Sequence, residues 1–307
     1  MTSPRDPALA ALLGSTVPPL DGPDTLTAFA PVWTEAVAGL DDSVDRAALG
    51  GFMAPSVGLG FVAGYRSALD RMLPSLRGRA AALCVTEAGG NHPRAIAARL
   101  AGDPPVVTGE KVWSTAADTG DVLLVAASRG TRNGRNDIGV AIVPAAQSGV
   151  TFHPMPPTPF VPDIPHYRVE LDQARVERVL DGDGYDQIVK PFRTVEDIHV
   201  SAALTGHLLG VATHFGAPNA VRSDLIHALL GLRALARLDP LDPTGHIGLA
   251  GWLSAQERGL ARLEDSLWPL ADESTVARWK RDSPLLGVAG RARARRLTRG
   301  WEALGQA

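Results

Sequence analysis

The sequence predicts an α+β protein with three domains in the order helical, β, helical. The boundaries are an N-terminal helical domain over 1–82, a middle antiparallel β-barrel or sandwich domain over 83–186, and a C-terminal helical bundle over 187–307. The outer segments are rich in Ala and Leu, with apolar residues recurring every three or four positions, whereas the middle has short β-branched runs. A chain of 307 residues is long enough for two or three domains.

The N-terminal segment is expected to contain several helices. Asp41-Asp42-Ser43 offers an N-cap, and Tyr65–Leu76 has helical spacing of its apolar residues. The run from Ala47 to Tyr65 has 19 residues without a charge, close to the length of a membrane span. Because this run contains Pro55, Ser56 and five glycines, it predicts a buried helix pair and no membrane span.

The middle segment contains five β-type runs separated by Gly, Pro, Asn and Asp, which is typical of a barrel or sandwich. The runs are 83–85, 105–107, 122–126, 138–143 and 167–171, and Arg132-Asn133-Gly134 marks a turn between two of them. After Gly184 the helical pattern returns in four segments, with Asp239-Pro240-Leu241-Asp242-Pro243 as a linker. These segments are 195–212, 224–238, 249–267 and a last helix from about 285.

Composition excludes several classes of protein. Apolar residues make up 45% and charged residues 21%, with a formal net charge of −3, so nothing in the global balance indicates nucleic acid or an anionic membrane as a partner. The single cysteine, Cys84, excludes an internal disulfide framework and a cysteine-based zinc site. The first residues lack the pattern of a secretory signal, so we expect a cytoplasmic protein.

Three further patterns in the sequence suggest a binding site, but each also has a structural explanation. Gly58-Leu59-Gly60-Phe61-Val62-Ala63 matches a nucleotide fingerprint, but no strand precedes it, so its glycines are expected at helix contacts. The eight histidines include no pair at metal-binding spacing, and we expect no metal site. A third pattern places arginines on one stripe near the C-terminus, as either a solvated face or a phosphate-binding surface. These arginines are Arg291, Arg295 and Arg299.

A candidate binding segment begins at Thr86, a hydroxyl residue at the end of a predicted strand. An acidic residue and two glycines follow it. Such a turn presents a hydroxyl and several backbone N–H groups to an anionic or planar polar group. Further on, Trp113 and Thr115 alternate with Ser114, so on a strand they lie on one face. An aromatic plate beside a hydroxyl suits a fused ring, although a simple turn and a buried Trp remain an alternative.

Together the two segments resemble motifs of the acyl-CoA dehydrogenase family. Thr86-Glu87 resembles the start of the family's T-E-P-G-x-G-S-D loop, and the segment 109–115 (GEKVWST) resembles its G-x-K-x-W-I-T strand with one substitution. The segments 71–78 and 169–176 resemble flanking parts of the family pattern, so the likeness extends over roughly residues 60–212.

The resemblance implies an FAD-dependent α,β-dehydrogenase of acyl-CoA thioesters in fatty acid metabolism. It implies that Thr86 binds the pyrimidine end of the flavin, that Trp113 packs on the ring and that Thr115 reaches N5. The backbone of Gly89, Gly90 and Asn91 would lie near the pyrophosphate. We also expect an electron acceptor such as an electron-transfer flavoprotein, and a homodimer as the assembly.

The sequence departs from the family pattern in its loop and in its C-terminal part. Ala88 replaces the loop proline, Asn91-His92 stand in place of Ser-Asp, and no Q-x-x-G-G-x-G segment follows. An arginine is also missing three residues before Phe215. Two further functions therefore stay open: a non-catalytic relative that keeps the fold for binding or assembly, and a flavin monooxygenase or reductase.

The candidate catalytic base is Glu196. Thr194 is expected to be the N-cap of a helix, which would place Glu196 in its first turn. The ten-residue spacing to Gly206 resembles that in the isovaleryl-type branch of the family, where the base lies at the start of this helix. Glu302 is the runner-up, and a structural alternative is that Glu196 and Asp197 only complement the helix dipole.

Overall fold

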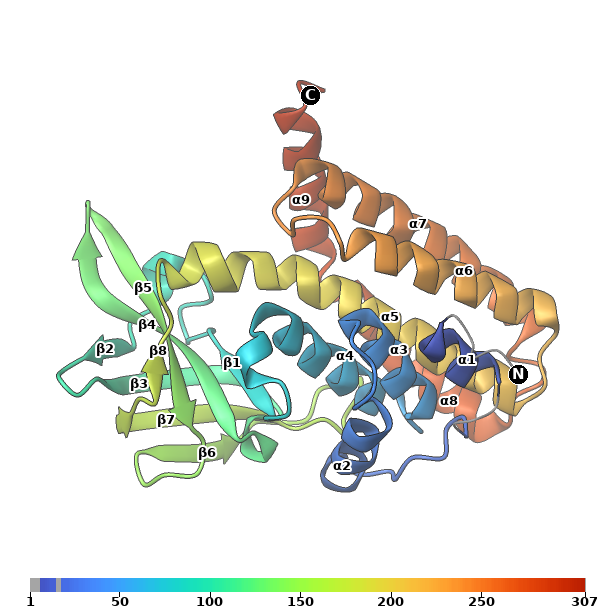
Figure 1. Cartoon of the computed structure of the whole chain (residues 1–307), viewed down its shortest axis with the longest axis horizontal. Helices are drawn as coiled ribbons and strands as arrows, with labels where there is room; N and C mark the ends of the chain where they lie inside the picture. Colours follow the sequence, from blue (N-terminus) through green and yellow to red (C-terminus); the bar gives the residue numbers. More distant parts are fainter. Residues whose placement is uncertain (1–5, 15–17, 307) are drawn as a thin grey trace. The chain divides into compact units, whose positions relative to one another are not determined.

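The structure is a computed structural model that describes residues 6–14 and 18–306. The chain divides into two compact units (Figure 1). The helical unit comprises Met1–Ala68, Thr158–Asp163 and Thr194–Ala307, and the β unit comprises Leu69–Pro157 and Ile164–Arg193. The predicted α+β class is confirmed, with helices before and after a β region.

The α-helices belong to the helical unit, apart from residues 69–72 and 190–193, which belong to the β unit. The helices are α1 (Pro7–Leu13), α2 (Leu26–Ala36), α3 (Ser43–Met53), α4 (Val57–Met72), α5 (Lys190–His214), α6 (Asn219–Leu235), α7 (Pro243–Ser266), α8 (Glu273–Asp282) and α9 (Gly290–Ala303). Carboxylates cap several of them: Asp42 accepts a hydrogen bond from the Val44 amide at 2.8 Å, and Asp242 in the predicted linker accepts one from Thr244 at 2.7 Å. The expected N-cap at Asp42 is confirmed, whereas α8 was not predicted.

The uncharged run 47–65 forms the buried parts of α3 and α4, as expected. Its glycines allow close contact with α5, since a Cβ on Gly51 would overlap the carbonyl oxygen of Ala203. A Cβ on Gly64 would lie 2.8 Å from the carbonyl oxygen of His199, and one on Gly206 would overlap that of Ala48. None of the described helices combines the length and the apolar character needed to cross a bilayer.

Helix α5 also contributes a buried histidine to this core. His207 is 6% exposed, and its Nδ1 donates a hydrogen bond to the carbonyl oxygen of Ala54 at 3.0 Å. Burial lowers the pKa of His207 to about 4, since the charged imidazolium would lose its hydration. His207 is therefore neutral at physiological pH.

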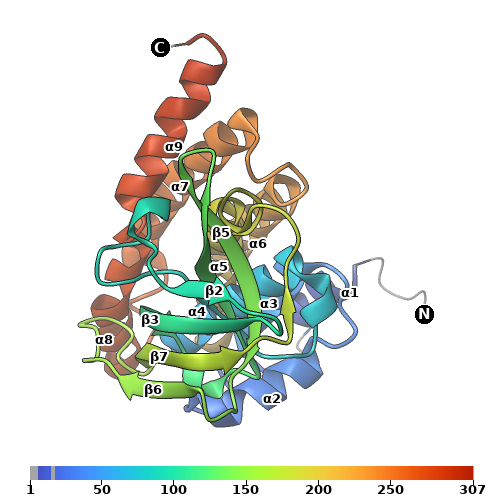
Figure 2. The same ribbon diagram turned by 90° about the vertical axis from the view of Figure 1, so that its left-hand side faces the viewer.

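The β unit is a curved eight-stranded sheet (Figure 2). Its strands are β1 (Ala81–Cys84), β2 (Arg99–Ala101), β3 (Val106–Thr115), β4 (Val122–Arg132), β5 (Arg135–Pro144), β6 (Val150–Pro154), β7 (His166–Arg175) and β8 (Arg178–Val179). The order is β6-β7-β3-β2-β4-β5-β8, and β1 pairs with β4. Most pairs are antiparallel, as predicted, but β1 and β2 each pair with β4 in parallel.

The five predicted runs correspond to β1, β3, β4, β5 and β7. The predicted turn joins β4 to β5, where Asn133 and Gly134 have φ of 51° and 70°. Two successive positive φ values characterise the tight hairpin turns that match strand twist. Apolar side chains on one face of this hairpin, including Leu123, Val125 and Val143, enter the core of the β unit.

Candidate functional site

The two sequence motifs meet in the β unit. Lys111 on β3 lies 2.6 Å (Nζ to Oε1) from Glu87, which follows β1. The same ammonium donates to the carbonyl oxygen of Val85 at 3.3 Å, and the Val112 amide donates to that of Thr86 at 2.8 Å. The loop after β1 is therefore attached to β3 next to Trp113.

Glu87 and Lys111 hold this loop in place. The Lys111 side chain is fully buried, and burial lowers its pKa while the hydrogen bond and charge of Glu87 oppose that shift. The Glu87 carboxylate also accepts hydrogen bonds from the amides of Ala97 and Ala98, at 2.8 and 3.0 Å. With all these partners inside the fold, Glu87 has a structural role that the sequence motif alone did not reveal.

A tight turn follows Glu87. The Gly90 amide donates to the Glu87 carbonyl at 2.8 Å, and the Glu87 amide donates to the Gly90 carbonyl at 3.0 Å. Gly90 has φ of 107°, which favours glycine. The amides of Ala88, Gly89 and Asn91 have no hydrogen-bond partner among the described residues. Such unpaired N–H groups at a turn can bind an anion.

Trp113 lies on an irregular part of β3. The register with β7 shifts between Lys111 and Ser114, and Trp113 has φ of 58°, so the strand departs from simple alternation here. Trp113 is 48% exposed, and its backbone amide donates a hydrogen bond to Sδ of Met155 at 3.2 Å. The indole ring packs edge-on against the His166 ring, with the ring centroids 5.9 Å apart. Desolvation lowers the pKa of His166, so a neutral imidazole supports the exposed indole.

Two hydroxyls accompany this tryptophan. Ser114 is buried, whereas Trp113 is exposed and Thr115 is half-buried. The hydroxyls of Thr86 and Thr115 form no hydrogen bond within the described parts of the chain. The β unit thus presents an indole plate, two unused hydroxyls and three unused amides, a donor set that fits the ring and pyrophosphate of a flavin nucleotide.

Glu196 lies on α5 in the helical unit and is half-buried. The expectation that Thr194 is the N-cap is wrong, because α5 begins at Lys190 and directly follows the π-helical turn Tyr185–Val189. Thr194 is buried inside the helix, and its Oγ1 lies 3.3 Å from Nε2 of His246. Glu196 is therefore not in the first turn, and the dipole argument for its position does not apply.

Asp197, next to Glu196, is bound by arginines of α9. Arg293 Nη2 lies 2.9 Å from Asp197 Oδ1, and Arg296 forms a second ion pair with the same carboxylate. Asp197 is only 7% exposed, so these contacts compensate a nearly buried charge. The sequence analysis did not predict this link between α5 and α9.

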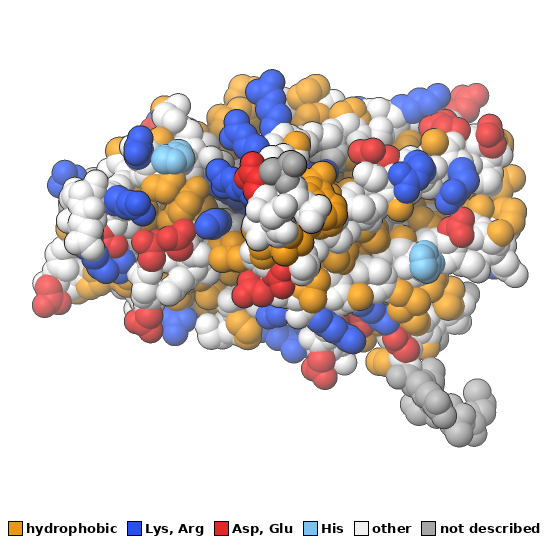
Figure 3. Space-filling view, turned by 90° about the horizontal axis from the view of Figure 1, so that it is seen from above, with side chains coloured by type: hydrophobic (Ala, Val, Ile, Leu, Met, Phe, Trp, Pro, Cys, Tyr) orange, Lys and Arg blue, Asp and Glu red, His pale blue; other side chains and the backbone are white. Residues whose placement is uncertain are grey.

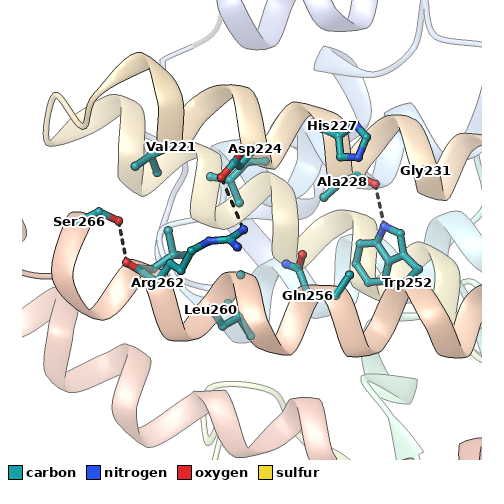
Figure 4. Close-up of a pocket in the computed structure, with 14 residues that line it drawn as sticks. Val221, Asp224, His227, Ala228, Gly231, Trp252, Gln256, Leu260, Arg262 and Ser266 are labelled. Atoms are coloured by element: carbon teal, nitrogen blue, oxygen red, sulfur yellow. Dashed lines mark hydrogen bonds and ion pairs between the residues drawn. The ribbon is translucent and has the colours of Figure 1, made fainter.

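A groove of about 200 Å³ lies between α6 and α7 (Figure 4). Trp252 Nε1 donates to the Ala228 carbonyl at 2.9 Å, and Arg262 pairs with Asp224 at 3.6 Å along its edge. The groove has a mostly apolar lining and contains none of the site residues predicted from the sequence.

Comparisons with known proteins identify the fold. No family model and no curated protein matches the chain, whereas many solved structures do. FkbI, described as "for Biosynthesis of Methoxymalonyl Extender Unit of Fk520 Polyketide Immunosuppresant", is 20% identical with a TM-score of 0.62 and covers 96% of both chains. Butyryl-CoA dehydrogenase from Megasphaera elsdenii is 13% identical, with a TM-score of 0.60 over 89% of this chain and 86% of that one.

PigA with FAD and proline is 11% identical, with a TM-score of 0.63 over 90% of this chain and 89% of that chain. The chain therefore has the acyl-CoA dehydrogenase fold. The resemblance noted in the two sequence motifs is confirmed at the level of the fold.

Proposed function

We infer that this protein is an FAD-dependent oxidoreductase that dehydrogenates an acyl thioester between Cα and Cβ. The observation that carries this proposal is the indole of Trp113, exposed on a bulge and accompanied by the unused hydroxyls of Thr86 and Thr115. An exposed aromatic plate with hydrogen-bond donors at its margin is suited to the face and edge of an isoalloxazine. The shared fold with the PigA–FAD complex supports the same cofactor.

The residues of the β unit have distinct roles in this proposal. Trp113 packs on the ring, Thr86 donates to its pyrimidine end, and Thr115 donates near N5. The amides of Gly89 and Asn91 bind the pyrophosphate, and Gly90 shapes the turn because its own amide is bonded to Glu87. When bound, FAD would supply the hydride-transfer chemistry, and the protein would orient both reactants.

Glu196 is the proposed base that removes the α-proton. Asp197 beside it is held in ion pairs with Arg293 and Arg296 and is not available for proton transfer. The runner-up, Glu302 near the end of α9, is exposed to water. A half-buried carboxylate such as Glu196 is better suited to become desolvated by a bound acyl chain, which raises basicity.

The remaining assignments follow from this function. We propose a CoA-linked or carrier-linked acyl thioester as substrate, a protein such as an electron-transfer flavoprotein as the electron acceptor, and a homodimer as the assembly. Binding and orientation of both reactants account for much of the rate enhancement in such a site.

The visible absorption spectrum tests the proposal. The purified chain, or the chain reconstituted with FAD, should show a flavin band that an acyl-CoA bleaches anaerobically. A colourless protein that cannot be reconstituted would indicate the non-catalytic relative. A coloured protein that no acyl-CoA reduces, but that oxygen rapidly reoxidises after chemical reduction, would indicate the monooxygenase or reductase.

A further inference from the structure

Helix α9 has a concentration of positive charge. It contains five arginines and one glutamate, in a chain whose formal net charge is −3. The C-terminal end of α9 extends beyond the hairpin formed by α6 and α7 (Figures 1 and 2). The arginines are therefore presented on an accessible helix of the helical unit.

These arginines fall into two groups. Arg293 and Arg296 are half-buried and bind Asp197. The others, Arg291, Arg295 and Arg299, are exposed, follow one another every four residues, and form no hydrogen bond or ion pair with any described residue. We call these three the arginine row. At about 1.5 Å per residue the row extends over about 12 Å along α9. Figure 3 shows that several Lys and Arg side chains lie on this face of the molecule.

The arginine row lies on the exposed face of α9. The groove between α6 and α7 and the smaller cavity next to Trp279 and Arg293 are lined by other residues. Small molecules and nucleotides bind in concave sites that bury most of their surface. A line of exposed guanidinium groups is better matched to a surface of carboxylates on another protein.

The position of α9 indicates which kind of protein binds there. The opposite face of the same helix is bound to Asp197, the neighbour of the proposed base Glu196. A partner on the arginine row would thus bind the same helix that is ion-paired to the neighbour of the proposed base. We propose that the arginine row docks the acidic face of an acyl-carrier protein, which delivers the acyl thioester on its phosphopantetheine arm.

This inference rests on the proposed function and names the carrier of its substrate. Exposed charge pairs increase the association rate and contribute modest affinity, which suits a partner that must leave after each turnover. They are also screened by salt, so docking should weaken as ionic strength rises.

Binding of a fluorescently labelled holo acyl-carrier protein with net negative charge tests the inference. The variant Arg291→Glu/Arg295→Glu/Arg299→Glu should weaken binding to the full-length protein at least about tenfold at low ionic strength. The matching Lys variant should keep most of the affinity, because the charge remains. The control Arg135→Glu/Arg175→Glu/Arg237→Glu, which reverses three other exposed arginines, should bind nearly as the wild type does.

If the triple Glu variant of the arginine row bound the acyl-carrier protein as tightly as the control variant does, the inference would be overturned. Loss of CoA binding with unchanged carrier binding would instead make the row a nucleotide site, and loss of only electron-transfer flavoprotein binding would make it a redox interface. The assay needs no flavin, so carrier binding can succeed or fail independently of FAD content and of the proposed dehydrogenation.

Discussion

The Lys111 ammonium and the Glu87 carboxylate, 2.6 Å apart, form a nearly buried ion pair that joins the loop after β1 to β3. This pair determines where Thr86 and Trp113 lie relative to each other. Thr86 directly precedes Glu87, and Trp113 directly follows Val112, whose amide donates to the Thr86 carbonyl. The donors proposed to bind a flavin thus depend on an interaction between two other residues.

Glu87→Ala should lower the free energy of unfolding by about 3–5 kcal/mol, because it leaves a buried ammonium without its counter-charge. The double variant Glu87→Ala/Lys111→Met should recover part of this loss. In the exposed pair Arg79–Glu177, Glu177→Ala should cost less than about 1 kcal/mol. Urea unfolding followed by circular dichroism measures all three, and equal losses for the two single variants would show that the Lys111 pair is not important for stability.

Trp113→Ala should weaken FAD binding at least about tenfold, since stacking and the excluded water around the ring are lost. Trp301→Ala is a matched control, because Trp301 is 43% exposed but lies on α9. Equilibrium dialysis gives both dissociation constants. Unchanged flavin content in Trp113→Ala would contradict the assignment of this tryptophan.

Glu196→Gln should retain FAD and acyl-thioester binding but slow flavin reduction at least about a hundredfold, because the amide cannot accept the α-proton. Glu302→Gln should reduce flavin at nearly the wild-type rate. Anaerobic stopped-flow measurements distinguish the two glutamates. The opposite result, with only Glu302→Gln impaired, would identify Glu302 as the base.

His207 should make stability depend on pH. Its folded pKa of about 4 lies below the usual value, so the unfolded chain takes up a proton first as pH falls. The free energy of unfolding should therefore have its full value above about pH 6.5. It should decrease by about 1.4 kcal/mol per pH unit as the pH falls towards 4. His207→Asn, which can still donate to Ala54, should show a smaller loss between pH 6.5 and 5 in urea titrations. The same pH dependence in both proteins would exclude His207 as the source.

Gly206→Ala should destabilise the protein by at least about 1–3 kcal/mol, because the added methyl overlaps the Ala48 carbonyl oxygen. Gly251→Ala in α7, where nothing lies within 4 Å, should instead increase stability by up to about 1 kcal/mol. Thermal denaturation measures both changes. A loss of similar size at both glycines would mean that helix contact at Gly206 is not the cause.

The fold class and the long β runs could be predicted because periodicity and turn residues are local properties. Asn133-Gly134 specifies a hairpin by itself, and Asp42 caps α3 through a contact two residues away. The short strands β2, β6 and β8 have no such local signal, since their pairing depends on neighbours distant in the sequence. The predicted start of α5 was wrong for a related reason. A π-helical turn precedes the helix and extends its backbone to residues that are not typical N-caps.

The candidate site was only partly predictable. The sequence indicated Thr86, Trp113 and Thr115, but the bulge that exposes Trp113 depends on the register with β7. The contact of Met155 with Trp113 and the ion pairs of Asp197 link residues far apart in the chain. No spacing rule within one segment could have shown them.

The close contact of Gly206 with Ala48 has a consequence for synthesis. Between these two residues the ribosome must translate the whole β unit, because the helical unit is formed from separate segments of the chain. At about 5–20 residues per second, the apolar faces of α3 and α4 remain uncovered for roughly 8–30 seconds after they emerge. We therefore expect the nascent N-terminal helices to need protection from aggregation until α5 leaves the exit tunnel.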